Sequence, residues 1–410
     1  MKIYLFDTIE AHTNLLPLSF TRPLADFRCG ILTIREKWEK RISGEYGYYP
    51  VDYLREKFGT VSDPGEEALY IAGNLLPDED LLERVNNLPS GEKIIIEGKI
   101  VVFKGSLNSL EAQLDETSHH EKGKGGAPFN PDNIIKYVFD IFLKNGDQIK
   151  KDYVLITKGR KSAPLPECVR MVKNSTFSLG KDDEQYPDVF IEEGAVVECA
   201  TINTVKGPVY IGKDAVLMEE ACVRGPFALC EESEVRMGAK IYESTTIGPH
   251  CKVGGEINNT VFFGYSNRAH EGYLGNAVIG EWCNIGAGTN ASNLKNDYSK
   301  IRLWNYATRS FMRTDLQFCG LIMGDHSKIG VNCMINTATV IGVGVNIHGA
   351  GFPRTFVPCF CEGSPVSGFS QVSLQKFIEI AQRVMARRNH ELGDADETIY
   401  RHIYDEALEW

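Results

Sequence analysis

The chain has 410 residues, of which 43% are hydrophobic and 24% charged, a composition typical of folded globular proteins that excludes a largely disordered chain. Acidic residues outnumber basic ones by 55 to 44, which argues against nucleic acid as the main partner, because nucleic-acid binding normally needs a basic surface. No apolar run approaches the ~18 residues of a membrane span, and the first residues lack a signal-peptide core. We therefore expect a cytoplasmic protein without a membrane partner, whose eleven cysteines are reduced and hold no metal.

Residues 1–175 are predicted to form an α/β domain, because short apolar runs alternate there with segments of helical periodicity. Strands are expected at 2–6, 93–97, 99–103 and 153–157, and helices at 32–41 and 132–145. The polar segment 106–130, rich in glycine, serine and histidine, is expected to be a loop.

A six-residue repeat dominates residues 186–365. Every sixth residue from Ile211 to Val253 is aliphatic, and the same register returns between Met323 and Ile347. The fourth position after each of these residues is mostly small. A period of six fits neither a helix nor simple strand alternation, and it predicts a coil of short flat strands whose aliphatic residues share one central column.

The repeat is interrupted twice. It slips by two residues between Val253 and Val261, and it disappears over an inserted loop at 290–322. A loop that leaves a rigid solenoid is a common place for a binding site, although a solvated surface loop would have a similar charge. Residues 366–410 are predicted to be a helical tail, because apolar residues between Phe377 and Met385 fall at helical spacing.

One segment of the solenoid resembles a known family. Between Arg268 and Asn290, His-x-x-Tyr-Leu-Gly is followed by Asn-Ile-Gly-Ala-Gly-Thr, which is similar to the bacterial bifunctional enzymes that make UDP-N-acetylglucosamine. Those enzymes join a glucosamine-1-phosphate N-acetyltransferase to an N-acetylglucosamine-1-phosphate uridyltransferase. Residues 235–239 also resemble their Leu-Arg-Pro-Gly-Ala segment. The resemblance implies a left-handed parallel β-helix, a homotrimer, and acetyl-CoA as cosubstrate.

The same resemblance implies roles for individual residues. His270 is the candidate general base, since imidazole titrates near neutral pH. Ala287 would offer its backbone to the acetyl-CoA thioester. The residues expected to hold the acceptor sugar phosphate are Arg236, Tyr273, Asn284, Asn293, Lys295 and Lys300. One departure is that 255–258 reads Gly-Glu-Ile-Asn where the family has a phosphate-binding lysine.

The N-terminus resembles a second motif of this family. Residues 16–23, Leu-Pro-Leu-Ser-Phe-Thr-Arg-Pro, are similar to the segment that follows the nucleotide loop of sugar-phosphate nucleotidyltransferases. The glycine-rich loop that would cradle a triphosphate is missing, and Leu24 stands where the family has a lysine. The candidate nucleotide-binding residues are Asp7, Arg22, Arg28 and Lys37, and Mg²⁺ is expected if nucleotidyl transfer takes place.

Two hypotheses of different classes follow. The first is a sugar-phosphate N-acetyltransferase coupled to sugar-1-phosphate nucleotidyl transfer, acting in nucleotide-sugar synthesis for the cell envelope. The second is a non-catalytic trimeric scaffold or nucleotide-sugar-binding regulator. The missing glycine loop favours the second for the N-terminal half, whereas His270, Tyr273 and Asn284 favour the first for the C-terminal half. The acceptor sugar, the acyl group and the nucleobase are open.

Overall fold

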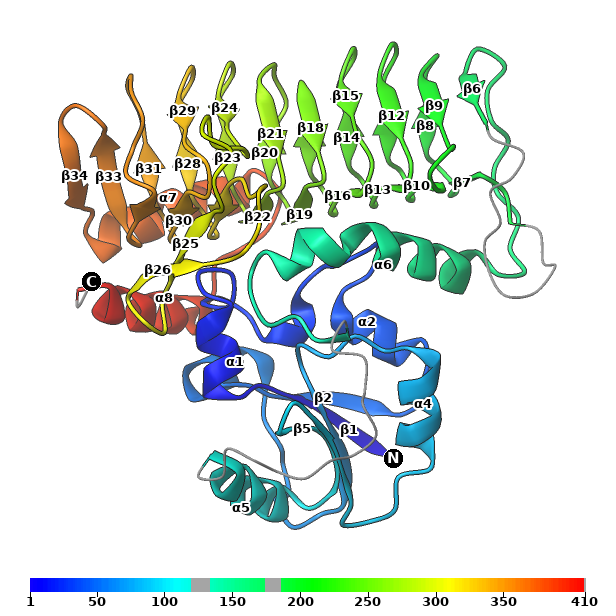
Figure 1. Cartoon of the computed structure of the whole chain (residues 1–410), viewed down its shortest axis with the longest axis vertical. Helices are drawn as coiled ribbons and strands as arrows, with labels where there is room; N and C mark the ends of the chain where they lie inside the picture. Colours follow the sequence, from blue (N-terminus) through cyan, green and yellow to red (C-terminus); the bar gives the residue numbers. More distant parts are fainter. Residues whose placement is uncertain (119–132, 174–185, 409–410) are drawn as a thin grey trace. The chain divides into compact units, whose positions relative to one another are not determined.

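A computed structural model of the chain describes residues 1–118, 133–173 and 186–408. The chain divides into two compact units (Figure 1). The first consists of Met1–Leu15, Thr21–Phe27 and Leu32–Tyr137, and the second of Leu16–Phe20, Arg28–Ile31 and Val138–Trp410. The last boundary between the two units falls after Tyr137, whereas the domain limits 175 and 365 stay predictions.

The first unit is built on a five-stranded mixed sheet in the order β2-β1-β3-β5-β4. Strand β1 runs parallel to β2 and β3, while β5 is antiparallel to β3 and β4. The strands are β1 (Lys2–Phe6), β2 (Glu45–Tyr49), β3 (Ala68–Ala72), β4 (Lys93–Ile96) and β5 (Lys99–Gly105). Strand β3 is buried throughout, as expected for the central strand of a sheet whose two faces are both covered.

The helices of the first unit are short, and local sequence sets their ends. Thr33 forms a capping box with Glu36 and so starts α2. The helices are α1 (Ile9–Asn14), α2 (Ile34–Glu39), α3 (Arg55–Phe58), α4 (Glu79–Asn86) and α5 (Leu107–Ser118), with one-turn 3₁₀ segments at Leu24–Asp26 and Asp52–Leu54. The predicted loop at 106–130 is wrong for α5. Leu107 and Leu110 are buried on one face of this helix, and the polar residues around them hid that helical spacing in the sequence. The rest of that loop lies outside the described residues.

The second unit contains α6 (Asp140–Thr157), which packs against β13, β16 and β19 of the solenoid. The predicted strand at 153–157 is therefore wrong: this apolar run is the last turns of a helix whose buried residues recur every three or four positions, from Ile141 to Tyr153. The predicted helix at 132–145 overlaps only the start of α6, because Asp140 is its first residue.

The solenoid has three parallel sheets, each formed by one side of every coil (Figure 1). The nine-stranded sheet contains β7 (Val189–Ile191), β10 (Val209–Ile211), β13 (Phe227–Leu229), β16 (Thr245–Ile247), β19 (Val261–Gly264), β22 (Val278–Glu281), β27 (Ile322–Met323), β30 (Val340–Ile341) and β32 (Phe356–Val357). The ten-stranded sheet contains β8 (Val196–Val197), β11 (Val216–Leu217), β14 (Glu234–Val235), β17 (Lys252–Val253), β20 (Asn267–Arg268), β23 (Asn284–Ile285), β28 (Lys328–Ile329), β31 (Asn346–Ile347), β33 (Cys361–Ser364) and the antiparallel β34 (Gly368–Gln371). The eight-stranded sheet contains β6 (Arg170–Val172), β9 (Thr201–Asn203), β12 (Cys222–Arg224), β15 (Lys240–Ile241), β18 (Glu256–Asn258), β21 (Tyr273–Gly275), β24 (Asn290–Ala291) and β29 (Met334–Ile335).

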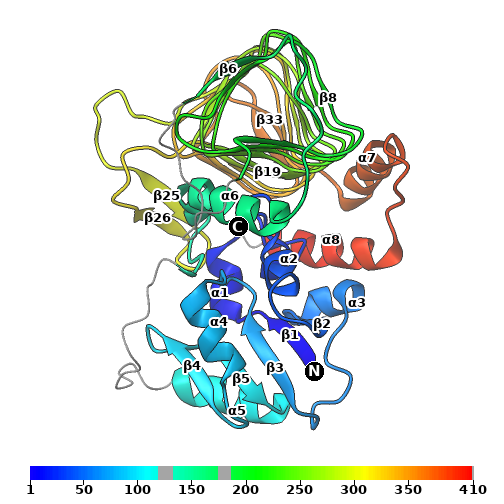
Figure 2. The same ribbon diagram turned by 90° about the vertical axis from the view of Figure 1, so that its right-hand side faces the viewer.

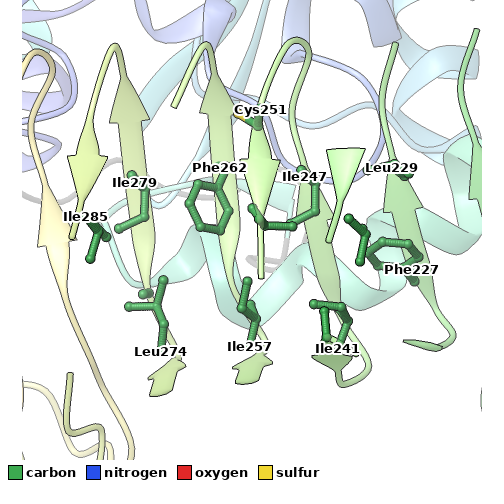
Figure 3. Close-up of a cluster of buried hydrophobic side chains, with 14 of the residues drawn as sticks. Phe227, Leu229, Ile241, Ile247, Cys251, Ile257, Phe262, Leu274, Ile279 and Ile285 are labelled. Carbon is green, nitrogen blue, oxygen red and sulfur yellow. The ribbon is translucent and has the colours of Figure 1, made fainter. Parts of the chain in front are cut away.

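The six-residue period produces this coil directly. Val209 pairs with Phe227, and Phe227 with Thr245, so one coil takes 18 residues, or three repeats. Seen along its axis, successive coils overlay one another (Figure 2). Ile247, Ile257 and the equivalent residues point inward and are fully buried (Figure 3). Burying each such side chain stabilises the fold by about 1.5–3 kcal/mol. The predicted α/β domain, parallel β-helix and C-terminal helices are confirmed.

The insertion and the tail complete the second unit. Between β24 and β27 the chain leaves the coil and forms an antiparallel hairpin, β25 (Arg302–Asn305) and β26 (Ser310–Arg313). Trp304 of this hairpin stacks on Phe356, with ring centroids 4.2 Å apart. Two amphipathic helices follow the last coil, α7 (Leu374–Ala386) and α8 (Asp394–Ala407). Among the described residues, no helix is long and apolar enough to cross a membrane.

Candidate functional site

A pocket of about 940 Å³ lies on the outward face of the ten-stranded sheet. Strands β14, β17, β20, β23 and β28 and the turns that follow them form its floor. The end of α7 and the residues after it form another wall, through Val384, Arg387 and Arg388. Three residues predicted for the acyl-transfer site meet in this pocket: Arg236, His270 and Asn284.

His270 stands at the turn that joins β20 to β21. This turn is exposed, and the imidazole forms no hydrogen bond with the described residues. The main chain of the turn is well held, since the amide of Glu256 donates to the carbonyl of Gly272 at 2.9 Å. The ring is therefore available to a ligand on a fixed backbone.

A polar row crosses the pocket floor because parallel pairing aligns equivalent residues. Lys252, Asn267, Asn284 and Lys328 occupy the same outward position on four neighbouring strands. The Nδ2 of Asn267 donates to Oδ1 of Asn284 at 2.9 Å. Lys328 donates from Nζ to the carbonyls of His326 (2.6 Å) and Trp282 (3.2 Å). Burial lowers the pKa of Lys328 to about 8, although nearby Cys283 and Asp325 favour its charged form.

The pocket is cationic. Its lining includes five lysine and arginine residues against one carboxylate, that of Glu271. Arg236 and Lys252 share the carboxylate of Glu234, at 3.1 and 2.5 Å. Arg387 and Arg388, in contrast, form no ion pair within the described part of the chain. Cations at a helix C-terminus also interact with the helix dipole, but two unpaired guanidinium groups facing a pocket favour an anionic ligand.

A second polar cluster lies on the eight-stranded sheet, after the same turn. Asn293 donates from Nδ2 to Oη of Tyr273 at 2.9 Å and to Oδ1 of Asn276 at 2.7 Å. The amide of Tyr273 donates to Oδ1 of Asn290 at 2.8 Å. The predicted sugar-binding residues Tyr273 and Asn293 thus meet each other, but they do not line the pocket. Ala287 lies in the next turn, where its carbonyl accepts from the amide of Asn332 at 2.7 Å.

Lys295 and Lys300 lie in the insertion, away from the pocket lining. Lys295 donates from Nζ to the carbonyl of Lys300 at 3.3 Å, and Lys300 donates to the carbonyl of Asp315. Within this chain both lysines are held by the insertion itself, and their predicted role in phosphate binding stays a prediction.

The N-terminal candidates centre on Asp7, which directly follows β1. Its carboxylate accepts from the amide of Leu24 at 3.1 Å, so it contacts the segment that follows Arg22. Gly73 follows the neighbouring strand β3, and a Cβ there would lie 2.4 Å from Oδ1 of Asp7. Burial raises the pKa of Asp7 to about 8; the Leu24 amide opposes this shift and the charge of Asp26 adds to it.

The other candidate nucleotide-binding residues do not all belong to the same unit. Arg22 and Lys37 are buried in the first unit. Arg28 belongs to the second unit, where its Nε donates to the carbonyl of Phe263 at 3.3 Å. No group of three His, Cys, Asp or Glu side chains within the described ranges could hold a metal ion. Asp7 and Asp26 are the carboxylates whose charges interact at this edge of the sheet.

Sequence reasoning missed an aromatic ladder beside the pocket. His250, Tyr265, Trp282 and His326 occupy one corner of four successive coils, all with φ between 52° and 60°. The rings of Tyr265 and Trp282 stack at 4.3 Å, and His390 packs edge-on against both. The ladder thereby joins the tail to the coil corner that borders the pocket. Its signal in the sequence is weak, because shortened coils and the insertion make the spacing irregular.

Comparisons with known proteins match both halves of the chain. Residues 3–161 match the model of the sugar nucleotidyl transferase family. The bifunctional protein GlmU of Bartonella quintana (strain Toulouse) is 25% identical over 339 residues, which cover 77% of this chain and 64% of that protein. Over most of its length the chain is similar to GlmU.

Other GlmU matches are shorter. GlmU of Gloeobacter violaceus is 30% identical over 129 residues, covering 31% of this chain and 23% of the relative. Across the first three relatives, the matched part spans between 23% and 64% of their own lengths. The solved structure of the polySia-specific acetyltransferase NeuO overlaps 51% of this chain and 87% of its own, with 11% identity and a TM-score of 0.25. That overlap is too weak to bear on activity.

Proposed function

We propose that the chain transfers an acyl group from acyl-CoA, with acetyl-CoA as the expected donor, to the amine of a sugar phosphate. The observation that carries the proposal is the position of His270: a histidine with an available ring beside a cationic pocket whose floor is a row of lysine and asparagine side chains. Acceptors of the glucosamine-1-phosphate class suit this pocket, since their phosphate and hydroxyl groups match its cations and amides. The similarity to GlmU supports the same reaction class.

In the proposed reaction His270 acts as general base. The acceptor nitrogen attacks the thioester carbonyl, the C–N bond forms and the C–S bond breaks. His270 takes the amine proton, which ends on the released thiol. Arg387 and Arg388 hold phosphate, and the amides of Asn267 and Asn284 hold sugar hydroxyl groups. The turn containing Ala287, one coil along, offers backbone groups to the thioester, as its small side chain allows close approach.

We propose nucleotidyl transfer to a sugar 1-phosphate as the activity of the first unit. Two observations favour it: the family match over residues 3–161, and the position of Asp7 at the carboxyl ends of adjacent parallel strands, where α/β sheets usually bind ligands. Mg²⁺ would be held by Asp7, and when bound it would neutralise charge on the triphosphate. The missing glycine-rich loop means that Arg22 and Lys37 would supply more of the phosphate binding.

The alternative is a non-catalytic scaffold or nucleotide-sugar-binding regulator. Both proposals expect a homotrimer, and the half-buried second cluster around Tyr273 and Asn293 is a surface to which a second copy could bring Lys295 or Lys300. Both also expect cytoplasmic small molecules as ligands. They differ in whether the pocket turns over acyl-CoA.

A release assay distinguishes them. Purified full-length protein is incubated with acetyl-CoA and, separately, glucosamine-1-phosphate, glucosamine-6-phosphate and free glucosamine, and thiol release is followed with a colorimetric reagent. We expect thiol release that requires an amino sugar phosphate and yields the N-acetyl product by mass spectrometry. If ligands bind but no acceptor or acyl donor gives turnover, the regulator hypothesis holds and acyl transfer is rejected.

A further inference from the structure

One corner of the solenoid is shorter than its neighbours, and it lies at the pocket. Four residues join β14 to β15, β20 to β21 and β23 to β24, but only Gly254 and Gly255 join β17 to β18. In the longer corners a small buried side chain usually fills the last position, as Ala239 and Thr289 do. Gly272 occupies that position in the corner of His270. Two adjacent corners therefore lack the side chain that fills the others.

The guanidinium of Arg268 occupies this space. Arg268 pairs with Val253 in the register, in a column whose other members, such as Leu217, Val235 and Ile285, are aliphatic. Only 2% of the residue is exposed. A Cβ built on Gly255 would lie 2.9 Å from Nη1, and one built on Gly272 would lie 3.0 Å from Nη2. A side chain at either glycine would collide with the guanidinium.

Arg268 connects the two corners. Its Nη1 donates to the carbonyl of Gly254 at 2.5 Å and to the carbonyl of His270 at 3.4 Å. Its Nη2 is buried and has no partner among the described atoms. The negative charge of Glu271, the next residue after His270, favours the charged form of Arg268.

An arginine is an unfavourable choice for packing alone. A buried cation loses its hydration, and an apolar residue of similar volume usually stabilises such a position at least as well. The arginine at 268 therefore has a role other than packing, and its hydrogen bonds to the two corners are what an aliphatic residue in this column could not form. We propose that Arg268 is a positioning residue that fixes the His270 turn against the shortened corner, so that the imidazole faces the pocket. The proposal rests on the proposed acyl transfer for its kinetic consequences.

The test compares Arg268→Met, Arg268→Lys and the wild type, with Ile285→Met as a matched control in the same column. We expect Arg268→Met to melt at or above the wild-type temperature, yet to show faster amide hydrogen exchange in residues 269–272. We expect its kcat to fall by about 10- to 100-fold, the usual cost of misplacing a catalytic group, with KM for acyl-CoA changed by less than about threefold. Arg268→Lys should recover part of kcat, because it keeps one charged donor, and Ile285→Met should keep both kcat and exchange.

The outcomes separate this proposal from the proposed function. If the wild type transfers no acyl group, the proposed function fails, while hydrogen exchange in 269–272 still decides the role of Arg268. Unchanged exchange in Arg268→Met overturns the positioning role, and so does unchanged kcat in an active enzyme. If Arg268→Met does not fold, Arg268→Lys decides: full activity with wild-type exchange supports a requirement for the charged donor, and an inactive variant with wild-type exchange overturns the proposal.

Discussion

Replacing Lys328 by methionine should make the free energy of unfolding less dependent on pH. Lys328 lies mostly buried in the pocket, and its Nζ has two backbone carbonyls as partners. Burial lowers its pKa from 10.5 to about 8, and each tenfold change in proton affinity is worth about 1.4 kcal/mol. The charged form therefore costs the folded state up to about 3 kcal/mol, and about 2 kcal/mol once residual solvent contact is allowed for.

The sign of the pH effect follows from where each state releases its proton. The unfolded lysine stays protonated up to about pH 10.5, whereas the folded one loses its proton near pH 8. Stability rises with pH wherever the unfolded state binds more protons. Below pH 8 the folded state bears the full cost of burying the charged lysine. Between pH 8 and 10.5 the stability of the wild type should therefore rise by about 2 kcal/mol relative to that of Lys328→Met.

The assay is urea unfolding of both proteins at pH 7 to 10.5, with the difference in unfolding free energy taken at each pH. Taking the difference removes the cysteine and tyrosine titrations that both proteins share. Methionine also loses the two carbonyl contacts, which offsets the curves by a constant and leaves the slope unaffected. A difference that stays constant across this range would refute the reasoning, because Lys328 would then titrate as an ordinary lysine.

Three further results are expected. Replacing both Arg387 and Arg388 by glutamine should raise the Kd for a sugar phosphate by about 10-fold or more in calorimetry while leaving the melting temperature within a few degrees; an unchanged Kd would remove the phosphate role of α7's end. UTP or dTTP with Mg²⁺ should raise the melting temperature of the wild type, and Arg22→Ala or Asp7→Asn should abolish that shift; a wild type that no nucleotide stabilises would leave the first unit without the proposed activity. Light scattering should give about three times 45.7 kDa, and a fully active monomer would contradict a site completed by a second copy.

The solenoid could be predicted because one aliphatic residue recurs at every sixth position, and this spacing can be seen directly in the sequence. Every sixth residue from Ile211 to Val253 is aliphatic, and a period of six fits neither a helix nor a simple strand. Helix α6 was missed at its C-terminal end because Tyr153 to Thr157 is a short apolar run, which looks the same in a strand and in a helix turn. The helical spacing of Leu107 and Leu110 was likewise hidden by the polar composition around it.

Only those site residues that belong to a local sequence motif could be predicted. His270 and Asn284 belong to one motif, and Arg236 to the matching segment of an earlier coil, so coil stacking brings them together. Arg387 and Arg388 reach the pocket through the packing of α7, which depends on contacts distant in sequence. Arg268 sits in the motif itself, but its burial follows from the two-residue slip, and only the coil geometry shows that the slip shortens a corner.

The most direct test of the account is the steady-state rate of acceptor-dependent CoA release by His270→Gln relative to the wild type, at saturating substrates. Glutamine keeps a polar side chain of similar reach but cannot take the proton. The account predicts a kcat lower by about 10²–10⁴, with an unchanged melting temperature and sugar phosphate still bound. A His270→Gln variant that releases CoA at the wild-type rate would contradict it.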